Sequence, residues 1–356
     1  MLASTPMATF TETVGFGESG PLAQFGVGLV VAFIWTSVIL TLLGFGGVWF
    51  KRKWNAAFGD RVAVNRVGPF GLLIIVADSL KLLAKEVVVP NDVDRLAYWG
   101  APILSTSSIL LSFVFIPWGS GLQISDPQAG LVLTFGLASI PSLGVVMAGY
   151  GSNNKYSFLG FEREVAQAIA YEIPFVISAA ALVPLVAFFG DGAPLQMSQI
   201  VAAQQGPLFG VEGIPLPNWF IFAQPLAAVI FFVAMLAEVA RNPFDLPEAA
   251  SELVAGYLTE YGGVNFTLMF LTEFAHMFLG GAIFTTLFLG GGAGPVLPAV
   301  LWFVIKMFAV YAVIQWLRAT IPRVRIDQLL QIGWKRLLEL SFLNLLFTTG
   351  IMWVTL

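Results

Sequence analysis

The chain contains 356 residues, of which 58% are hydrophobic and only 11% are charged, against about 25% charged residues in an ordinary soluble domain. Because 17 basic and 21 acidic residues cannot cover a surface of this size, most of the chain must be surrounded by lipid. Cysteine is absent and His276 is the single histidine, which excludes disulfides, thiolate-bound clusters, bis-histidine haem and multi-histidine metal sites, and the net charge of −4 excludes a basic surface for nucleic acid.

Eight apolar stretches are long enough to cross a bilayer, for which an α-helix needs roughly 20 residues. They lie at residues 22–50, 98–118, 128–150, 164–189, 219–238, 264–289, 296–317 and 337–356. The stretches are longer than the strands of a membrane barrel and lack their alternation of apolar and polar residues. We therefore predict an all-α polytopic membrane protein with a single transmembrane domain, residues 1–356, and eight membrane-spanning helices.

The orientation follows from the basic residues. Sixteen of the 17 Lys and Arg residues lie in the first, third, fifth and seventh connections, and Lys306 lies inside the seventh span. By the positive-inside rule these connections face the cytoplasm and both termini are external. The N-terminal segment, residues 1–21, is polar and acidic and lacks the basic start of a signal peptide.

The first connection contains a segment, residues 68–86, that we expect to be an amphipathic helix lying in the membrane interface. Pro69 suits a first helical turn, and Asp78, Lys81 and Lys85 share one helical face while the remainder is apolar. A ninth short span is the alternative, but its apolar part is shorter than a span requires.

The fifth connection, residues 239–262, is rich in carboxylates. Asp245 and Glu248 resemble a capping box, with Pro247 in the first helical turn. The spacing places Glu248, Glu252 and Glu260 on one helical face without a lysine nearby. This pattern favours a functional acidic loop; the alternative is a solvated acidic face at the membrane edge.

Ionisable residues also lie within or beside the spans, where each one is costly. They are Glu172, Glu238, Glu273, His276, Lys306 and Glu164. Lys306 could neutralise a carboxylate of a neighbouring helix. As a set they favour a proton or ion path, and the alternative is a buried ion pair that fixes helix register. We expect His276 to be a packing residue.

Four stretches of the basic connections resemble the membrane-embedded H subunit of NADH–quinone oxidoreductase, the family of subunit 1 of mitochondrial respiratory complex I. They begin at Asn65-Arg66-Val67-Gly68-Pro69-Phe70-Gly71, Gly151-Ser152-Asn153-Asn154-Lys155-Tyr156-Ser157, Arg241-Asn242-Pro243-Phe244-Asp245-Leu246-Pro247-Glu248 and Arg318-Ala319-Thr320-Ile321-Pro322-Arg323-Val324-Arg325. The third stretch is the most specific, and the resemblance covers nearly the whole chain from the first span.

The resemblance implies a subunit that binds quinone as substrate in a tunnel framed by the first span, the interfacial helix and the sixth span. It implies quinone-binding roles for Arg52, Arg66, Asp78, Arg318 and Arg323. It implies a proton or coupling path through Glu172, Glu238, Asp245, Glu248, Glu252, Glu260 and Glu273, to which we add Lys306. Its partners would be peripheral iron–sulfur subunits and neighbouring membrane subunits in the plasma membrane, and the chain itself would hold no metal or covalent cofactor.

This sequence departs from the family pattern at several positions. The family usually has Glu where this chain has Lys51; the other departures include Ala63, Val64, Ile74, Ile75 and Ala250. They indicate a divergent lineage, for which an archaeal source is one option, and they affect the lining of the quinone entrance.

Two further functions stay open. The chain could belong to a related energy-converting hydrogenase or a deazaflavin-dependent dehydrogenase, because the electron donor would bind another subunit. It could also be a self-contained ion transporter, although no inverted repeat is apparent.

Overall fold

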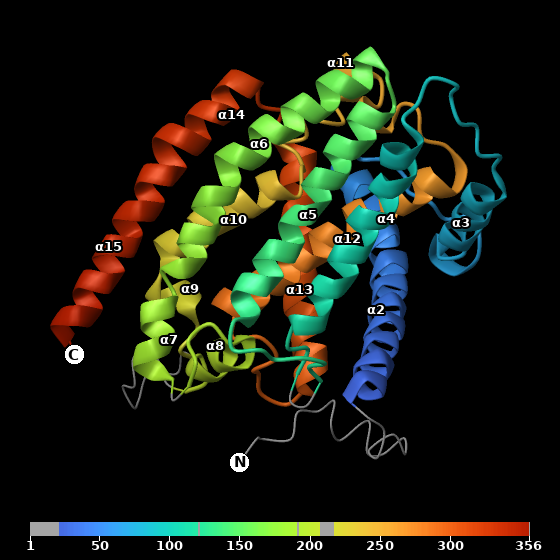
Figure 1. Ribbon diagram of the computed structural model, residues 1–356. Coiled ribbons are helices and arrows are strands. Elements are labelled where there is room, and N and C mark those ends of the chain that lie inside the picture. Colours follow the sequence, from blue (N-terminus) through green and yellow to red (C-terminus); the bar gives the residue numbers. More distant parts are fainter. Residues whose placement is uncertain (1–20, 120–121, 191, 207–216, 356) are drawn as a thin grey trace.

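The computed structural model describes residues 21–119, 122–190, 192–206 and 217–355 (Figure 1). The regular elements of these residues are helices, which confirms the predicted all-α class; the predicted polar segment lies outside them except for Pro21. In chain order the elements are α2 (Pro21–Phe58), a 3-10 turn (Pro69–Gly71), α3 (Ile74–Ala84), α4 (Arg95–Ser112) with a 3-10 turn (Phe113–Phe115), α5 (Gly130–Gly151), α6 (Lys155–Ala180), α7 (Val183–Phe189), α8 (Met197–Ala203), α9 (Phe220–Ala223), α10 (Pro225–Glu238), α11 (Ala250–Leu253), a 3-10 turn (Gly256–Leu258), α12 (Gly263–Phe288), α13 (Ala299–Thr320), α14 (Ile326–Ile332), a π-helical turn (Gly333–Leu337) and α15 (Leu338–Thr355).

Within the described residues, six helical segments are long and apolar enough to cross a membrane. They match six of the eight predicted spans, namely the second, third, fourth, sixth, seventh and eighth. The first predicted span lies within the 38-residue α2. The fifth falls on α9 and α10, and α10 has only 14 residues because Gln224 leaves the helical conformation before Pro225. A helix of that length rises about 21 Å, short of a bilayer core of about 30 Å. The total of eight spans therefore stays a prediction.

The long helices run between two ends of the molecule (Figure 1). At one end, the top of the view, lie α11, α14 and the connection from α3 to α4, while α3 itself lies lower at the right; we call this upper end the α3 end. At the opposite end lie α7 and α8, and the chain's C-terminus is found there too. The connections that carry 16 of the 17 basic residues meet at the α3 end, as the alternation of spans predicts.

Helix α12 occupies the centre of the bundle. It packs against α4, α13, α2 and α3, and 61% of its most apolar window is buried, against at most 44% for the other candidate spans. The residues from Met277 to Phe288 are buried without interruption. A helix that is apolar on every side is stable at such a position because neighbouring helices cover all of its faces.

The predicted helix at 68–86 is shorter in the structure. The backbone φ is positive at Gly68, Phe70 and Gly71, which interrupts the helix, so α3 begins only at Ile74. The apolar side chains of Leu73, Val76, Leu80 and Leu83 are exposed along one face of this segment. Asp78 and Lys81 of α3, with Lys85 just after its end, line a common cavity together with the apolar Ile75 and Leu82. That the exposed apolar row lies in the membrane interface stays a prediction.

The prediction of one helical acidic face in the fifth connection was wrong. This connection is mostly irregular, and its only α-helix in the described residues is the four-residue α11, whose preceding residue Ala249 makes no side-chain cap. The chain turns at Val254 and Gly256, where φ is 64° and 55°. A Cβ at Gly256 would lie 1.8 Å from the carbonyl oxygen of Pro247, so only glycine permits this close approach. The carboxylates of Glu248, Glu252 and Glu260 consequently lie in different surroundings.

Candidate functional site

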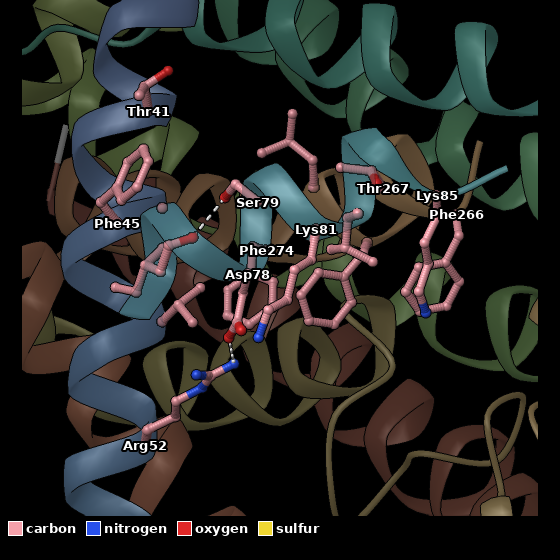
Figure 2. Close-up of a pocket in the computed structure, with 16 residues that line it drawn as sticks. Thr41, Phe45, Arg52, Asp78, Ser79, Lys81, Lys85, Phe266, Thr267 and Phe274 are labelled. Atoms are coloured by element: carbon pink, nitrogen blue, oxygen red, sulfur yellow. Dashed lines mark hydrogen bonds and ion pairs between the residues drawn. The ribbon is translucent and has the colours of Figure 1, made fainter. Parts of the chain in front are cut away.

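A cavity of about 500 Å³ lies between α2, α3 and α12 (Figure 2). Four phenylalanine rings provide much of its apolar wall: Phe45, Phe266, Phe270 and Phe274. Its polar groups are Thr41, Arg52, Asp78, Ser79, Lys81, Lys85 and Thr267. A cavity with aromatic walls and a few polar side chains suits a flat apolar ligand with a polar head.

Arg52 and Asp78, both predicted to bind quinone, meet in this cavity. The Arg52 Nη2 atom lies 2.7 Å from Asp78 Oδ2, and this ion pair joins α2 to α3 (Figure 2). Both side chains are about one third exposed or more, so the pair contributes less than about 1 kcal/mol to stability. Its effect is to orient the guanidinium and the carboxylate at the cavity wall.

The other three predicted quinone residues lie elsewhere. Arg66 is exposed and is absent from the cavity lining. Arg323 Nη2 lies 3.3 Å from Asp245 Oδ2, beside the fifth connection. Arg318 is half-buried near the end of α13, where Arg241, Glu273, Asp245 and Glu248 act on its charge. The structure thus associates Arg318 and Arg323 with the acids.

A second, small cavity of about 50 Å³ lies on the other side of α12 and collects acids from four segments. Its carboxylates are Glu164 of α6, Glu238 of α10, Glu248 of the fifth connection and Glu273 of α12. The Oε2 atoms of Glu164 and Glu238 are buried and accept no hydrogen bond from the described residues. Buried acids beside a cavity of this size provide the polar partners that an internal water molecule requires. We call this set the acid cavity.

The predicted path residue Glu172 extends the series. It lines a third cavity of about 290 Å³ between α5 and α6, and Glu238 lines this cavity as well as the acid cavity. Glu238 is therefore the link between Glu172 and the remaining acids. Of the eight predicted path residues, the fold brings Glu238, Glu248 and Glu273 to the acid cavity, and Glu172 adjoins them through the cavity that it shares with Glu238.

Arg241 supplies the positive charge of this region. It is 2% exposed and forms an ion pair with Glu273, and its guanidinium carbon lies 5.7 Å from the centre of the Phe274 ring. Glu248 and Asp245 also act on its charge. A buried guanidinium without a partner is very costly. The acids therefore stabilise the buried charge of Arg241, and Arg241 stabilises the buried charges of the acids.

Burial changes the proton affinity of the acids in the fifth connection. Desolvation, with the negative charge of Glu273 second, raises the pKa of the Glu248 carboxyl to about 8. Burial also raises the pKa of Asp245, although Arg323 and Arg241 oppose this effect. Glu248 can therefore exchange a proton near neutral pH.

Glu252 and Glu260 do not reach the acid cavity. Glu252 is about half exposed and forms an ion pair with Arg163. Glu260 accepts a hydrogen bond from the side chain of Asn154, and its backbone carbonyl accepts one from the Tyr98 hydroxyl at 2.9 Å. These contacts fix the end of the fifth connection against α4 and the start of α6.

Lys306 lies apart from the acids. Its Nζ atom donates to the carbonyl oxygens of Leu289, Gly291 and Ala293 at 2.7, 2.9 and 2.7 Å, and lies 4.3 Å from the centre of the Trp219 ring. These carbonyls follow the C-terminus of α12, where a positive charge is favourable. The carboxylate partner that the sequence suggested is replaced by this cap.

Sequence reasoning gives no role to Arg241 or Lys51 in this region. It presents Arg241 only as a basic residue of a connection, and Lys51 only as a basic residue that departs from the family pattern. Hydropathy cannot identify a buried arginine in a connection, because from hydropathy alone every arginine is expected to face solvent. His276 lines the acid cavity, a position that sequence spacing indicates only through its neighbour Glu273. Among the described residues, no group of three or more His, Asp or Glu side chains is placed to hold a metal ion.

Comparison with known proteins shows the family to which the chain belongs. Residues 29–349 match a family model described as NADH dehydrogenase. The chain is 41% identical over 329 residues to the H subunit of the NADH-quinone oxidoreductase of Dehalococcoides mccartyi strain CBDB1, with 92% of this chain and 88% of the relative covered. It is 43% identical over 325 residues to the H 2 subunit of the same enzyme of Cereibacter sphaeroides, covering 91% and 97% of the two chains. Since both the family model and these relatives extend over nearly all of its length, the chain belongs to the NADH dehydrogenase family that contains the H subunits of NADH-quinone oxidoreductase.

Proposed function

We propose that this chain is the quinone-binding and redox-to-proton coupling subunit of a proton-translocating NADH–quinone oxidoreductase. The family and the relatives' names support the complex, and the two cavities support the role. The chain supplies binding and electrostatics, while the electrons come from an iron–sulfur cluster on a partner subunit.

The observation that carries this proposal is the position of α12 between the two cavities. Thr267, Phe270 and Phe274 line the α2–α3–α12 cavity, whereas Met269, Glu273 and His276 line the acid cavity. One helix thus separates the quinone from the buried acids. A charge that develops on the quinone acts across about one helix diameter, in surroundings where charges are poorly screened.

In this mechanism quinone reaches the cavity from the bilayer between α2 and α3, and Arg52 and Asp78 orient its polar head. A partner's iron–sulfur cluster would supply the two electrons, and the reduced quinone would carry negative charge in the cavity until it takes up two protons. The acids respond by exchanging protons, first Glu248 and Glu273, then Glu238 and Glu172 toward neighbouring membrane subunits. Glu252 and Glu260 form the outer edge of this acidic loop.

The α3 end is assigned to the cytoplasm, which makes it the docking surface for the peripheral iron–sulfur arm in the plasma membrane. The basic residues gathered there support this orientation. A groove of about 650 Å³ also lies at this end, and its lining includes Asp92, Asp94, Asn153, Asn154 and Lys155.

Filling the quinone cavity tests the function directly. Gly44 lines the cavity, and a Cβ added there meets nothing within 4 Å, so Gly44→Leu occupies ligand space without a clash at Cβ. We expect a KM for quinone raised by about tenfold in assembled complex, with NADH–ferricyanide activity unchanged. Gly26→Leu on the same helix is the matched control, because Gly26 also has open space around it. Unchanged quinone kinetics in Gly44→Leu would reject the assignment of the cavity.

The coupling role has its own test. Glu248→Gln retains the shape of the buried side chain and removes its proton exchange, so we expect the number of protons pumped per NADH to fall in inverted membrane vesicles. Glu252→Gln should have the smaller effect because Glu252 is about half exposed. Normal pumping in both variants would remove the acidic loop from the mechanism.

A further inference from the structure

Lys51 is a charged residue of this region to which the mechanism above gives no role. It follows the predicted first span on α2, next to Arg52 of the cavity wall, and its side chain is half-buried. Its Nζ atom lies 4.5 Å from the centre of the Phe274 ring and 6.0 Å from that of Phe270. At the shorter distance a lysine ammonium is attracted by the negative face of the ring.

Phe274 connects this ammonium with the buried arginine. The Arg241 guanidinium carbon is 5.7 Å from the centre of the same ring, and Phe274 is the α12 residue adjacent to Glu273. The ring also belongs to the wall of the α2–α3–α12 cavity, where Figure 2 labels it. Lys51 and Arg241 therefore share one aromatic ring at the boundary between the two cavities.

Four charged groups from three other segments act on Lys51. Burial, followed by the guanidinium groups of Arg241 in the fifth connection and Arg318 on α13, disfavours its positive charge and lowers the pKa of Lys51 to about 7. The carboxylates of Glu273, on α12, and Glu248, in the fifth connection, favour it. In the described part of the chain no carboxylate lies within ion-pair distance of Lys51. The acids of the path thus offset only part of the cost of its charge, and no fixed ion pair holds it, so its charge responds to changes in its surroundings.

We propose that Lys51 is a positioning residue that couples the charge in the α2–α3–α12 cavity to the buried acids Glu248 and Glu273 across the ring of Phe274. A negative charge on the quinone attracts the ammonium, which weakens its hold on the two carboxylates. This inference rests on the proposed function. It assigns the coupling to a lysine at one of the positions where the chain departs from the family pattern.

The test compares three variants in assembled complex in inverted membrane vesicles. Lys51→Met removes the charge and retains most of the unbranched side chain, and Lys51→Arg retains the charge. Lys53→Met is the control, because the Lys53 ammonium instead donates a hydrogen bond to Asn65. Lys51 lowers the pKa of Glu248, so its loss raises that pKa. Because Lys51 is the weakest of the charges that act on Glu248, we expect the acid side of the pH profile of proton pumping to move by about a quarter to half a pH unit toward alkaline pH in Lys51→Met. Lys51→Arg restores most of the profile, and Lys53→Met leaves it unchanged.

Phe274→Leu provides a second variant should Lys51→Met impair assembly. It removes the ring face and leaves both cations in place, so it shifts the profile in the same direction by a smaller amount. The inference is overturned if every Lys51 or Phe274 variant that assembles has the wild-type pH profile. If that result accompanies lost pumping in Glu248→Gln, the inference alone fails. If Glu248→Gln also pumps normally, the proposed function fails with it.

Discussion

The ion pair between Arg241 and Glu273 gives the sharpest prediction about stability. Arg241 is 2% exposed and the Glu273 side chain 11%, so neither charge reaches much water. Removing one partner of a buried pair costs about 3–5 kcal/mol because the other charge is left uncompensated. Arg241→Met, which is neutral and unbranched, should therefore destabilise the subunit by about that amount.

The two single substitutions should not be equal. Arg241 also interacts with Glu248 and Asp245, so its loss leaves three carboxylates with less positive charge nearby. Glu273→Gln leaves Arg241 with two acids and should cost less. The double variant Arg241→Met/Glu273→Gln removes both charges and should cost no more than Arg241→Met alone, a departure from additivity of about 3 kcal/mol.

The assay is thermal dissociation of the detergent-solubilised complex, followed as loss of this subunit from the assembly on native gels. We expect the midpoint to fall in the order wild type, Glu273→Gln, Arg241→Met, with the double variant at or above Arg241→Met. NADH–ferricyanide activity reports on the peripheral arm and serves as the internal control. Additive losses, or an Arg241→Met midpoint equal to that of wild type, would refute the argument that these charges are buried as a pair.

Three further outcomes are expected. Burial raises the folded-state pKa of Glu248 from 4.5 to about 8, so proton binding contributes stability that is full below pH 4.5 and is lost as pH rises through about 8. Glu248→Gln should abolish this decline in thermal midpoint between about pH 5 and 8. Gly256→Ala should prevent stable assembly, since its Cβ would lie 1.8 Å from the Pro247 carbonyl oxygen at a φ of 55°, whereas Gly136→Ala, with open space, should assemble normally on native gels. Lys306→Met removes three hydrogen bonds to carbonyls and should raise hydrogen exchange in the segment after α12 while leaving the pH profile of pumping unchanged.

Hydropathy and length could predict the helical class and most of the spans, because a bilayer imposes one length on every apolar helix. They could not predict the break in the fifth span, because hydropathy does not report that Gln224 leaves the helical conformation. As a result α10, which begins at Pro225, is too short for the bilayer. The acids Glu172, Glu238 and Glu273 were found from their cost within apolar segments. Such a cost is a local property and needs no knowledge of the fold.

The remaining features depend on contacts between distant segments. The acidic loop was predicted as a helix from local spacing, but the approach of Gly256 to Pro247 gives it another path. Arg241 and Lys51 look like ordinary cytoplasmic basic residues until α12 brings Glu273 and Phe274 beside them. Lys306 donates hydrogen bonds to backbone carbonyls of the loop after α12. The hydrophobic periodicity of the sequence does not predict the conformation of a loop.

The position of α12 has a consequence for resistance to inhibitors. A compound that occupies the α2–α3–α12 cavity would contact Phe270, Phe274 and Thr267, and escape would require substitutions on this helix. Those residues alternate along α12 with Met269, Glu273 and His276 of the acid cavity. A substitution that excludes the inhibitor would shift the helix against the acids as well. Resistant strains with changes in α12 should therefore pump fewer protons per NADH, whereas resistance arising in α3 should carry little such penalty.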